Sequence, residues 1–170
     1  MPNKVPKGWR EMSNIGAVVP GTHFIAFKTP LSWRMEWNLR RLKRAEPRLT
    51  HIIDLTNVDN GRYYDSSECQ RLGLGYTKVK VIGQAGVPPE WVVQQFYSAV
   101  AAALEQHPAG IVGVHSTDGV NRPGYLVCRH LVEVGGLQPD EAIAAFDEAR
   151  GEEQDSEVYL AHLRSRGWEN

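Results

Sequence analysis

The chain has 170 residues, of which 42% are hydrophobic and 23% are charged, and its formal net charge is −1. This size and composition suit one domain with a single core, which we expect to span residues 1–170. The charge excludes a protein whose whole surface attracts nucleic acid. We expect no signal peptide and no membrane contact, because no apolar run approaches membrane-spanning length. Cys69 and Cys128 lack metal-ligand spacing, so we expect free thiols in the nucleus or cytoplasm.

The first half of the chain contains three predicted strands. Residues 23–27 and 51–55 are short apolar runs typical of buried strands, and residues 76–82 alternate as half-buried strands do. Between the first two strands, residues 33–48 carry six basic side chains and only two acidic ones. This basic run is either a solvated helix face or a local patch that attracts an anionic partner.

The second half is expected to alternate helices with one buried strand. Apolar side chains recur at helical spacing over residues 88–107, which begin with two prolines and end before a proline–alanine–glycine break. Residues 111–114 form a continuous apolar run, and helices are predicted over 123–134, 139–150 and 156–166. Strands that alternate with helices indicate a three-layer α/β fold, in which helices flank a mostly parallel central sheet.

A polar loop follows the strand at residues 111–114 and leads directly into a helix. Ligands bind at the carboxyl ends of parallel strands, and a phosphate needs converging N–H groups, a helix N-terminus and a fixed cation. Gly119 lets the backbone turn inward, and Arg122 offers a planar fork that matches two phosphate oxygens. The sequence therefore predicts a phosphate-binding loop made of His115, Ser116, Thr117, Asp118, Gly119, Val120, Asn121, Arg122, Pro123 and Gly124.

The loop resembles the signature H-C-x-x-G-x-x-R-[S/T]-G of the cysteine-dependent phosphatases, which include the tyrosine and dual-specificity phosphatases. It is more similar to the branch that acts on RNA 5′ ends, which reads H-C-T-x-G-x-N-R-T-G-[FY]-L where this chain reads H-S-T-D-G-V-N-R-P-G-Y-L. That branch comprises the triphosphatase domain of metazoan mRNA capping enzymes, the PIR1-type phosphatase and its baculoviral relatives. Further similar segments, such as FIAFKTPL at 24–31 and IIDLTN at 52–57, occur in the same order across roughly residues 8–165.

The resemblance implies the three-layer phosphatase fold and hydrolysis of a phosphoric anhydride or a phosphomonoester. It places Ser116 at the position of the nucleophilic cysteine and Arg122 at that of the catalytic arginine. Arg62 and Arg150 are candidates for further contacts with RNA or phosphate. The resemblance implies no metal and no cofactor, and it implies an RNA 5′ tri- or diphosphate or a phosphoprotein as the partner. The oligomeric state and the identity of the RNA or protein stay open.

Four features depart from the pattern of that family. Ser116 replaces a cysteine whose lowered pKa makes it an ionised nucleophile, whereas an alcohol needs an adjacent base, and none is evident in the loop. Pro123 replaces a hydroxyl residue that in the family stabilises the leaving thiolate when the phosphoenzyme breaks down. Asp118 stands where close relatives often have histidine, and residues 152–159 are acidic where the PIR1-type branch is basic. We therefore expect this chain to bind phosphate with negligible turnover.

One absence favours the RNA branch over the tyrosine phosphatases. Protein-directed members carry an aspartate general acid on a separate loop, because their leaving group needs a proton. Residues 83–90 occupy the equivalent loop here and contain no aspartate. A phosphate or diphosphate leaving group departs unprotonated, so RNA-end phosphatases also lack this acid.

The serine at position 116 leaves three hypotheses open. In the first, the serine is natural and the protein is a pseudophosphatase that binds an RNA 5′ end or a phosphoprotein, which also accounts for Pro123 and Asp118. In the second, the natural residue is cysteine, and serine was introduced to trap substrate in an active RNA 5′-phosphatase or dual-specificity phosphatase. In the third, the protein is an interaction scaffold that no longer binds phosphate, which the retained Gly119 and Arg122 disfavour. A cysteine codon at position 116 of the gene would decide for the second.

Overall fold

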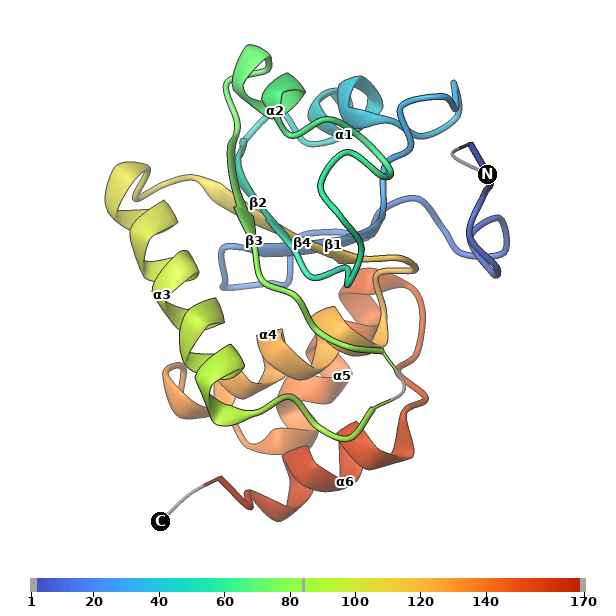
Figure 1. Cartoon of the computed structure of the whole chain (residues 1–170). Helices are drawn as coiled ribbons and strands as arrows, with labels where there is room; N and C mark the ends of the chain where they lie inside the picture. Colours follow the sequence, from blue (N-terminus) through green and yellow to red (C-terminus); the bar gives the residue numbers. More distant parts are fainter. Residues whose placement is uncertain (1–2, 84, 169–170) are drawn as a thin grey trace.

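Four parallel strands form the centre of the computed structural model, which describes residues 3–83 and 85–168 (Figure 1). The strands are β1 (Phe24–Lys28), β2 (Leu49–Asp54), β3 (Gly75–Lys78) and β4 (Ile111–Ser116). The helices are α1 (Leu39–Ala45), α2 (Ser67–Arg71), α3 (Glu90–Gln106), α4 (Asn121–Glu133), α5 (Pro139–Arg150) and α6 (Glu157–Ser165). The order across the sheet is β1-β4-β2-β3, so the strand that precedes the polar loop lies inside the sheet. The expected α/β fold with a parallel sheet flanked by helices is confirmed.

Side chains alternate between the two faces of the sheet and build a separate core on each face. Phe24 and Ala26 of β1 belong to a core with α3, α4, α5 and α6, whereas Ile25 and Phe27 belong to a core with α1 and α2. Figure 1 shows these two groups of helices on opposite sides of the strands. The sheet is thus covered on both faces, as parallel sheets usually are.

The strand register brings chemically active side chains to one edge of the sheet. Lys28 of β1 lies opposite Ser116 of β4, and Asp54 of β2 lies opposite His115. Lys78 of β3 in turn lies opposite Asp54. The carboxyl ends of all four strands therefore meet where β4 runs into the polar loop.

Helix α5 illustrates how local chemistry fixes the element boundaries. It begins at Pro139, where Gln138 and Glu141 form a capping box, and it ends before Gly151, which adopts the left-handed conformation. These are the limits that the sequence predicts. Among the described helices, none is both long enough and apolar enough to cross a lipid bilayer.

Two parts of the chain differ from the sequence-based expectation. The strand expected over residues 76–82 ends at Lys78, although the N–H of Val79 still donates to the Asp54 carbonyl at 2.9 Å. The short helix α2 was not expected, because its five residues carry no apolar periodicity. Helix α1 occupies only the middle of the basic run at 33–48.

Candidate functional site

The residues between β4 and α4 curl into a tight loop. Gly119 has a φ of 79°, a left-handed conformation that glycine adopts readily, and a Cβ at this position would overlap the main chain of Phe27. Helix α4 begins at Asn121 after the buried Val120, and no described side chain caps its first N–H groups. The loop therefore ends at the positive end of a helix dipole, which attracts an anion.

Ser116 is fully buried where β4 ends and the loop begins. Its Oγ accepts a hydrogen bond from the Gly119 N–H at 3.0 Å and donates to Asp118 Oδ1 at 3.4 Å. The main chain thus folds back over this hydroxyl, which stands where the resembled signature has its cysteine.

Arg122 closes one side of a cavity of about 500 Å³ at the mouth of the loop. Its guanidinium donates to the Val81 carbonyl at 3.1 Å and to Thr117 Oγ1 at 3.4 Å, so it is held across the loop and does not swing out into solvent. Ser156, which caps α6, and Tyr159 in its first turn also line the cavity. This placement lets the guanidinium fork contact an anion that enters the cavity.

The Asp118 carboxylate lines the same cavity. Its Oδ1 accepts a hydrogen bond from the Val120 N–H at 3.3 Å, so the side chain turns toward the loop. The sequence alone left the direction of this side chain open. Because a carboxylate in this position repels an incoming anion, Asp118 weakens the attraction that Arg122 provides.

Asn121 joins the loop to the segment before α6. Its Nδ2 donates to Asp155 Oδ1 at 2.7 Å, and its Oδ1 accepts from the Asp155 N–H at 2.9 Å. Pro123 is buried in the first turn of α4, where a helix does not need its missing N–H. A Cβ at Gly124 would overlap the side chain of Gln154. Pro123 and Gly124 therefore support the loop by packing, whereas Asn121 brings the Asp155 carboxylate to the cavity.

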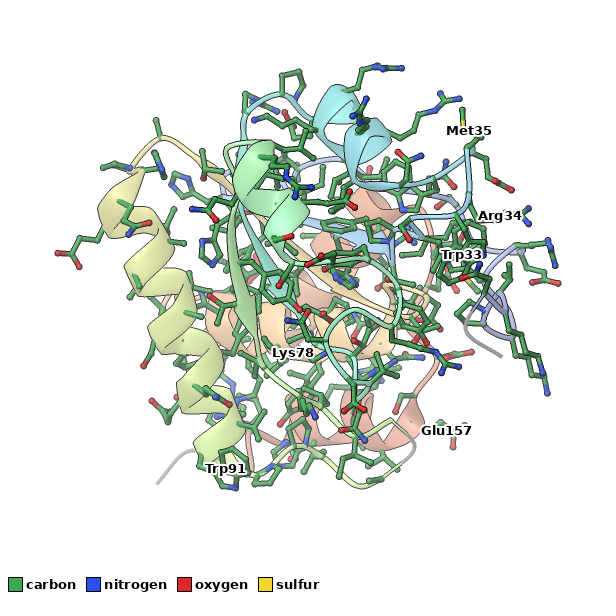
Figure 2. All side chains as sticks on the ribbon, turned by 45° about the horizontal axis from the view of Figure 1, so that its top comes forward. Trp33, Arg34, Met35, Lys78, Trp91 and Glu157 are labelled. Carbon is green, nitrogen blue, oxygen red and sulfur yellow. The ribbon has the colours of Figure 1, made fainter. Side chains whose placement is uncertain are left out.

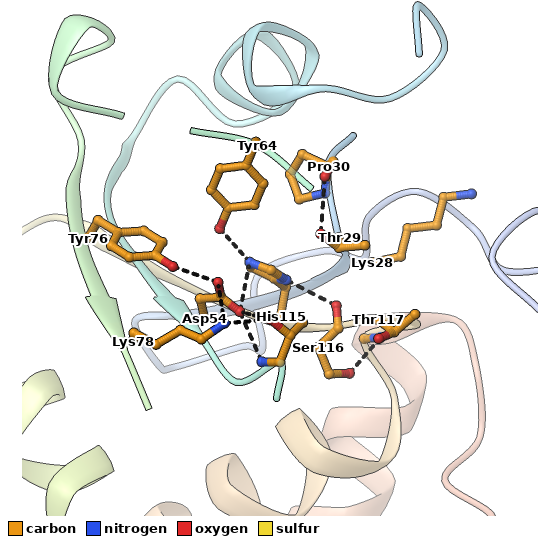
Figure 3. Close-up of polar contacts among 12 residues, drawn as sticks. Lys28, Thr29, Pro30, Asp54, Tyr64, Tyr76, Lys78, His115, Ser116 and Thr117 are labelled. Carbon is orange, nitrogen blue, oxygen red and sulfur yellow. Dashed lines mark hydrogen bonds and ion pairs between the residues drawn. The ribbon is translucent and has the colours of Figure 1, made fainter. Parts of the chain in front are cut away.

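A buried polar network lies beneath the loop (Figure 3). His115 is fully buried, and its Nδ1 lies 3.0 Å from the Ser116 carbonyl oxygen. Because a carbonyl oxygen only accepts, Nδ1 carries the proton, and Nε2 accepts from the Tyr64 hydroxyl at 2.6 Å. Both ring nitrogens are thereby engaged, so His115 is not placed to take the proton of the Ser116 hydroxyl.

Asp54 is the charged centre of this network. It accepts hydrogen bonds from the Tyr76 hydroxyl at 2.6 Å, from the Thr56 hydroxyl at 2.7 Å and from the Lys78 ammonium at 3.2 Å. Burial opposes ionisation, but the nearby His115 ring, these two hydroxyl groups and the ammonium lower the pKa of the Asp54 carboxyl. Burial also lowers the pKa of His115, and this outweighs the attraction of Asp54. The pair is therefore an ionised carboxylate beside a neutral imidazole.

Arg150 lies behind the loop and not at its mouth. It is only 2% exposed, and its guanidinium donates to the carbonyl oxygens of Gly119 and Asp118, each at 2.9 Å. It also donates to the hydroxyl and the carbonyl of Ser13. Arg150 therefore anchors the outer side of the loop. Arg62 is exposed on the segment before α2, and neither arginine is among the described residues that line the cavity.

Sequence reasoning missed the network around Asp54. The available signal was the position of Asp54 near the end of a predicted strand, because carboxyl ends of parallel strands meet at one edge. Tyr64 belongs to the same network, because it is buried and its hydroxyl donates to His115. Within the described part of the chain, no group of three or more His, Cys, Asp or Glu is arranged to hold a metal ion.

Comparison with known proteins gives relatives across nearly the whole chain, although no family model matches it. The chain is 38% identical to the tyrosine-protein phosphatase of Autographa californica nuclear polyhedrosis virus, with 93% of this chain and 98% of that protein covered. It is 34% identical to the RNA/RNP complex-1-interacting phosphatase of Rattus norvegicus, over 96% of this chain and 53% of the relative. The chain thus spans about half the length of this mammalian relative.

A solved structure of PTPMT1 in complex with PI(5)P has the same fold as the chain. The TM-score is 0.67 at 22% identity, over 87% of this chain and 91% of that one.

Proposed function

Because the chain belongs to the superfamily of tyrosine and dual-specificity phosphatases, in the family of its viral relative, we propose that its loop binds the terminal phosphates of an RNA 5′ end. With Ser116 at the nucleophile position, this form turns its ligand over negligibly. One observation carries the proposal: the loop residue Asp118, the first residue of α4, Asn121, and the Arg122 side chain all line the same cavity. Amide donors, a helix N-terminus and a planar cation are the groups that bind phosphate.

Two observations support an RNA end as the ligand in preference to a phosphoprotein. The rat relative is called an RNA/RNP complex-1-interacting phosphatase. In addition, Glu90 is the only acidic residue within 83–90, and it accepts a hydrogen bond from the Arg129 guanidinium at 2.7 Å. This loop therefore offers no carboxylic acid to protonate an alcohol leaving group. A phosphate or diphosphate leaving group needs no such acid.

The surroundings of Ser116 support the proposed lack of turnover. An alcohol becomes a nucleophile when a neighbouring base takes its proton. His115 has both ring nitrogens engaged, by the Ser116 carbonyl and the Tyr64 hydroxyl. Asp118 Oδ1 lies 3.4 Å from the hydroxyl oxygen, which is beyond the reach of about 2.6–3.2 Å that a general base needs.

Replacing the hydroxyl with a thiol tests this proposal. We expect the Ser116→Cys protein to release phosphate from 5′-triphosphorylated RNA, while the Ser116 form and a Ser116→Ala control release none above background. Equal activity of the Ser116 form and the Ser116→Cys protein would contradict the assigned nucleophile position. An inert Ser116→Cys protein would show that Pro123 and Asp118 also block turnover. This assay applies whether the serine is native or stands in for a native cysteine.

A second candidate function is hydrolysis or binding of a phosphoprotein. It is favoured by the viral relative, which is called a tyrosine-protein phosphatase and aligns along almost its whole length. The same Ser116→Cys protein separates the two ligands. Faster phosphate release from a phosphotyrosine peptide than from triphosphorylated RNA would favour the second candidate.

A further inference from the structure

A second groove, lined by an exposed tryptophan, lies beside the phosphate cavity. It has a volume of about 380 Å³, and its apolar wall includes Ile82, Val87 and Trp91. Trp91 is 68% exposed and Ile82 is 61% exposed, so two of the most exposed large apolar side chains of the described residues share one groove. Asn57 and Lys80 add polar groups to the lining. A groove of this composition suits a flat, partly polar ligand.

The groove adjoins the cavity that contains Arg122. The Val81 carbonyl accepts a hydrogen bond from the Arg122 guanidinium, and Val81 also lines the groove. Ala85 lines both hollows. A ligand whose phosphates contact Arg122 therefore has to cross only the segment that follows Val81 to reach Trp91.

Trp91 presents an exposed aromatic side chain on a backbone that is restricted locally. It lies in the first turn of α3, directly after Pro88, Pro89 and Glu90, and the two prolines restrict the backbone that leads into the helix. Figure 2 shows its side chain at the outer end of α3, away from the rest of the helix. Exposed aromatic side chains bind bases of single-stranded nucleic acid by stacking, and this binding tolerates any sequence.

We propose that this groove binds a nucleobase of the RNA whose 5′ phosphates occupy the cavity at Arg122, with Trp91 as the stacking surface. This inference rests on the proposed function and extends it to the nucleoside. The charge at the groove fits such a ligand: the Lys80 side chain is half exposed, and the carboxylate that pairs with it at 4.0 Å, that of Asp59, is fully exposed. An ion pair this exposed to solvent contributes little binding energy. The Lys80 ammonium is therefore available to a phosphodiester.

Binding of two probes to the same set of proteins tests the proposal. The probes are a short 5′-triphosphorylated RNA and inorganic tripolyphosphate, which lacks a base. We expect Trp91→Ala to weaken RNA binding by about fivefold to a hundredfold, the range known for loss of one stacked base, and to leave tripolyphosphate binding unchanged. Trp91→Phe should retain most of the RNA affinity. Met35→Ala is the matched control, because Met35 is 82% exposed and lies far from Trp91 (Figure 2).

The outcomes separate this inference from the proposed function. If Arg122→Ala weakens tripolyphosphate binding while Trp91→Ala leaves RNA binding unchanged, the base site is wrong and the phosphate site stands. If Arg122→Ala changes the affinity for neither probe, the proposed function itself fails. If Trp91→Ala weakens the binding of an apolar phosphopeptide but not the binding of RNA, the groove binds a protein side chain and the nucleobase assignment is overturned.

Discussion

The carboxylate of Asp118 contacts the hydroxyl of Ser116, with Oδ1 lying 3.4 Å from Oγ, and the same oxygen accepts the N–H of Val120. A negative charge thus occupies the mouth of a loop whose other groups suit phosphate binding. The carboxylate also attracts the Arg122 guanidinium, the cation that an incoming phosphate has to use. Any anion that enters the cavity therefore competes with a group of the protein itself.

Removal of this charge is expected to strengthen anion binding. Asp118→Asn keeps the size and the hydrogen-bonding oxygen of the side chain and loses its repulsion, which is about 1 kcal/mol for two charges 4 Å apart in water. We expect at least about fivefold tighter binding of tungstate or inorganic phosphate in isothermal titration calorimetry. Glu157→Gln is the control, because Glu157 is exposed in the same acidic region. Unchanged or weaker binding by Asp118→Asn would contradict the inward orientation.

Arg150 is expected to position the loop from behind. Arg150→Met deprives the buried Gly119 carbonyl and the partly buried Asp118 and Ser13 carbonyls of their donors, and the loss of a donor to a buried carbonyl costs about 1–3 kcal/mol. We expect the free energy of unfolding in urea to fall by more than about 3 kcal/mol, together with weaker tungstate binding under native conditions. The exposed Arg62→Met protein should match the parent in both measurements. Weaker binding without any loss of stability would instead indicate direct contact between Arg150 and the anion.

The hydrogen bond between Tyr64 and His115 is expected to stabilise the fold. Tyr64→Phe leaves the buried Nε2 of His115 without its donor, so the free energy of unfolding should decrease by about 1–3 kcal/mol. Tyr63→Phe is the matched control, because Tyr63 is the neighbouring tyrosine and its side chain is only half buried. Equal urea midpoints for Tyr64→Phe and the parent would show that the hydroxyl does not serve His115.

Stability is expected to fall as the pH decreases from 7.5 to 5.5. Burial lowers the pKa of four histidines: His51, His115, His130 and His162. Below about pH 6.5, the unfolded chain binds protons that the folded protein does not, so the free energy of unfolding decreases. The lowered pKa of Asp54 acts in the same direction, but only below about pH 3.9.

The slope of the free energy of unfolding against pH, measured between pH 7.5 and 5.5, identifies the part of this effect that belongs to His115. In His115→Gln the slope should be smaller than in the parent, whatever the absolute stability of the variant, because one proton-binding difference is gone. Urea unfolding at several pH values measures both slopes. A parent protein that is equally stable at pH 5.5 and 7.5, or an unchanged slope in His115→Gln, would contradict a neutral buried imidazole.

Periodicity and turn residues predicted most of the fold, because the elements concerned carry a clear local signal. Helix α5 has both a capping box and Gly151, and its limits agree with the expectation. Helix α2 could not be predicted in this way, because its five residues carry no apolar repeat. β3 ends at Lys78 although the apolar alternation continues, because strand length depends on pairing with β2.

The site was predictable only as far as one contiguous segment defines it. The loop from Ser116 to Arg122 is continuous in sequence, so its glycine and arginine could be interpreted together. The position of Arg150 could not be predicted, because whether an arginine faces a cavity or the outer side of a loop depends on tertiary packing. Two partners of Asp54, Tyr76 and Lys78, come from β3, which the strand register brings beside β2.

The most direct test of the account is a titration of the protein with 5′-triphosphorylated RNA, with the parent compared against Arg122→Ala and Arg122→Lys. Hydrogen bonds to charged groups contribute about 1.5–3 kcal/mol, so Arg122→Ala should bind about ten- to a hundredfold more weakly. Arg122→Lys should recover only part of this loss, because lysine lacks the planar fork. Equal affinities for the parent and Arg122→Ala would contradict a phosphate-binding loop.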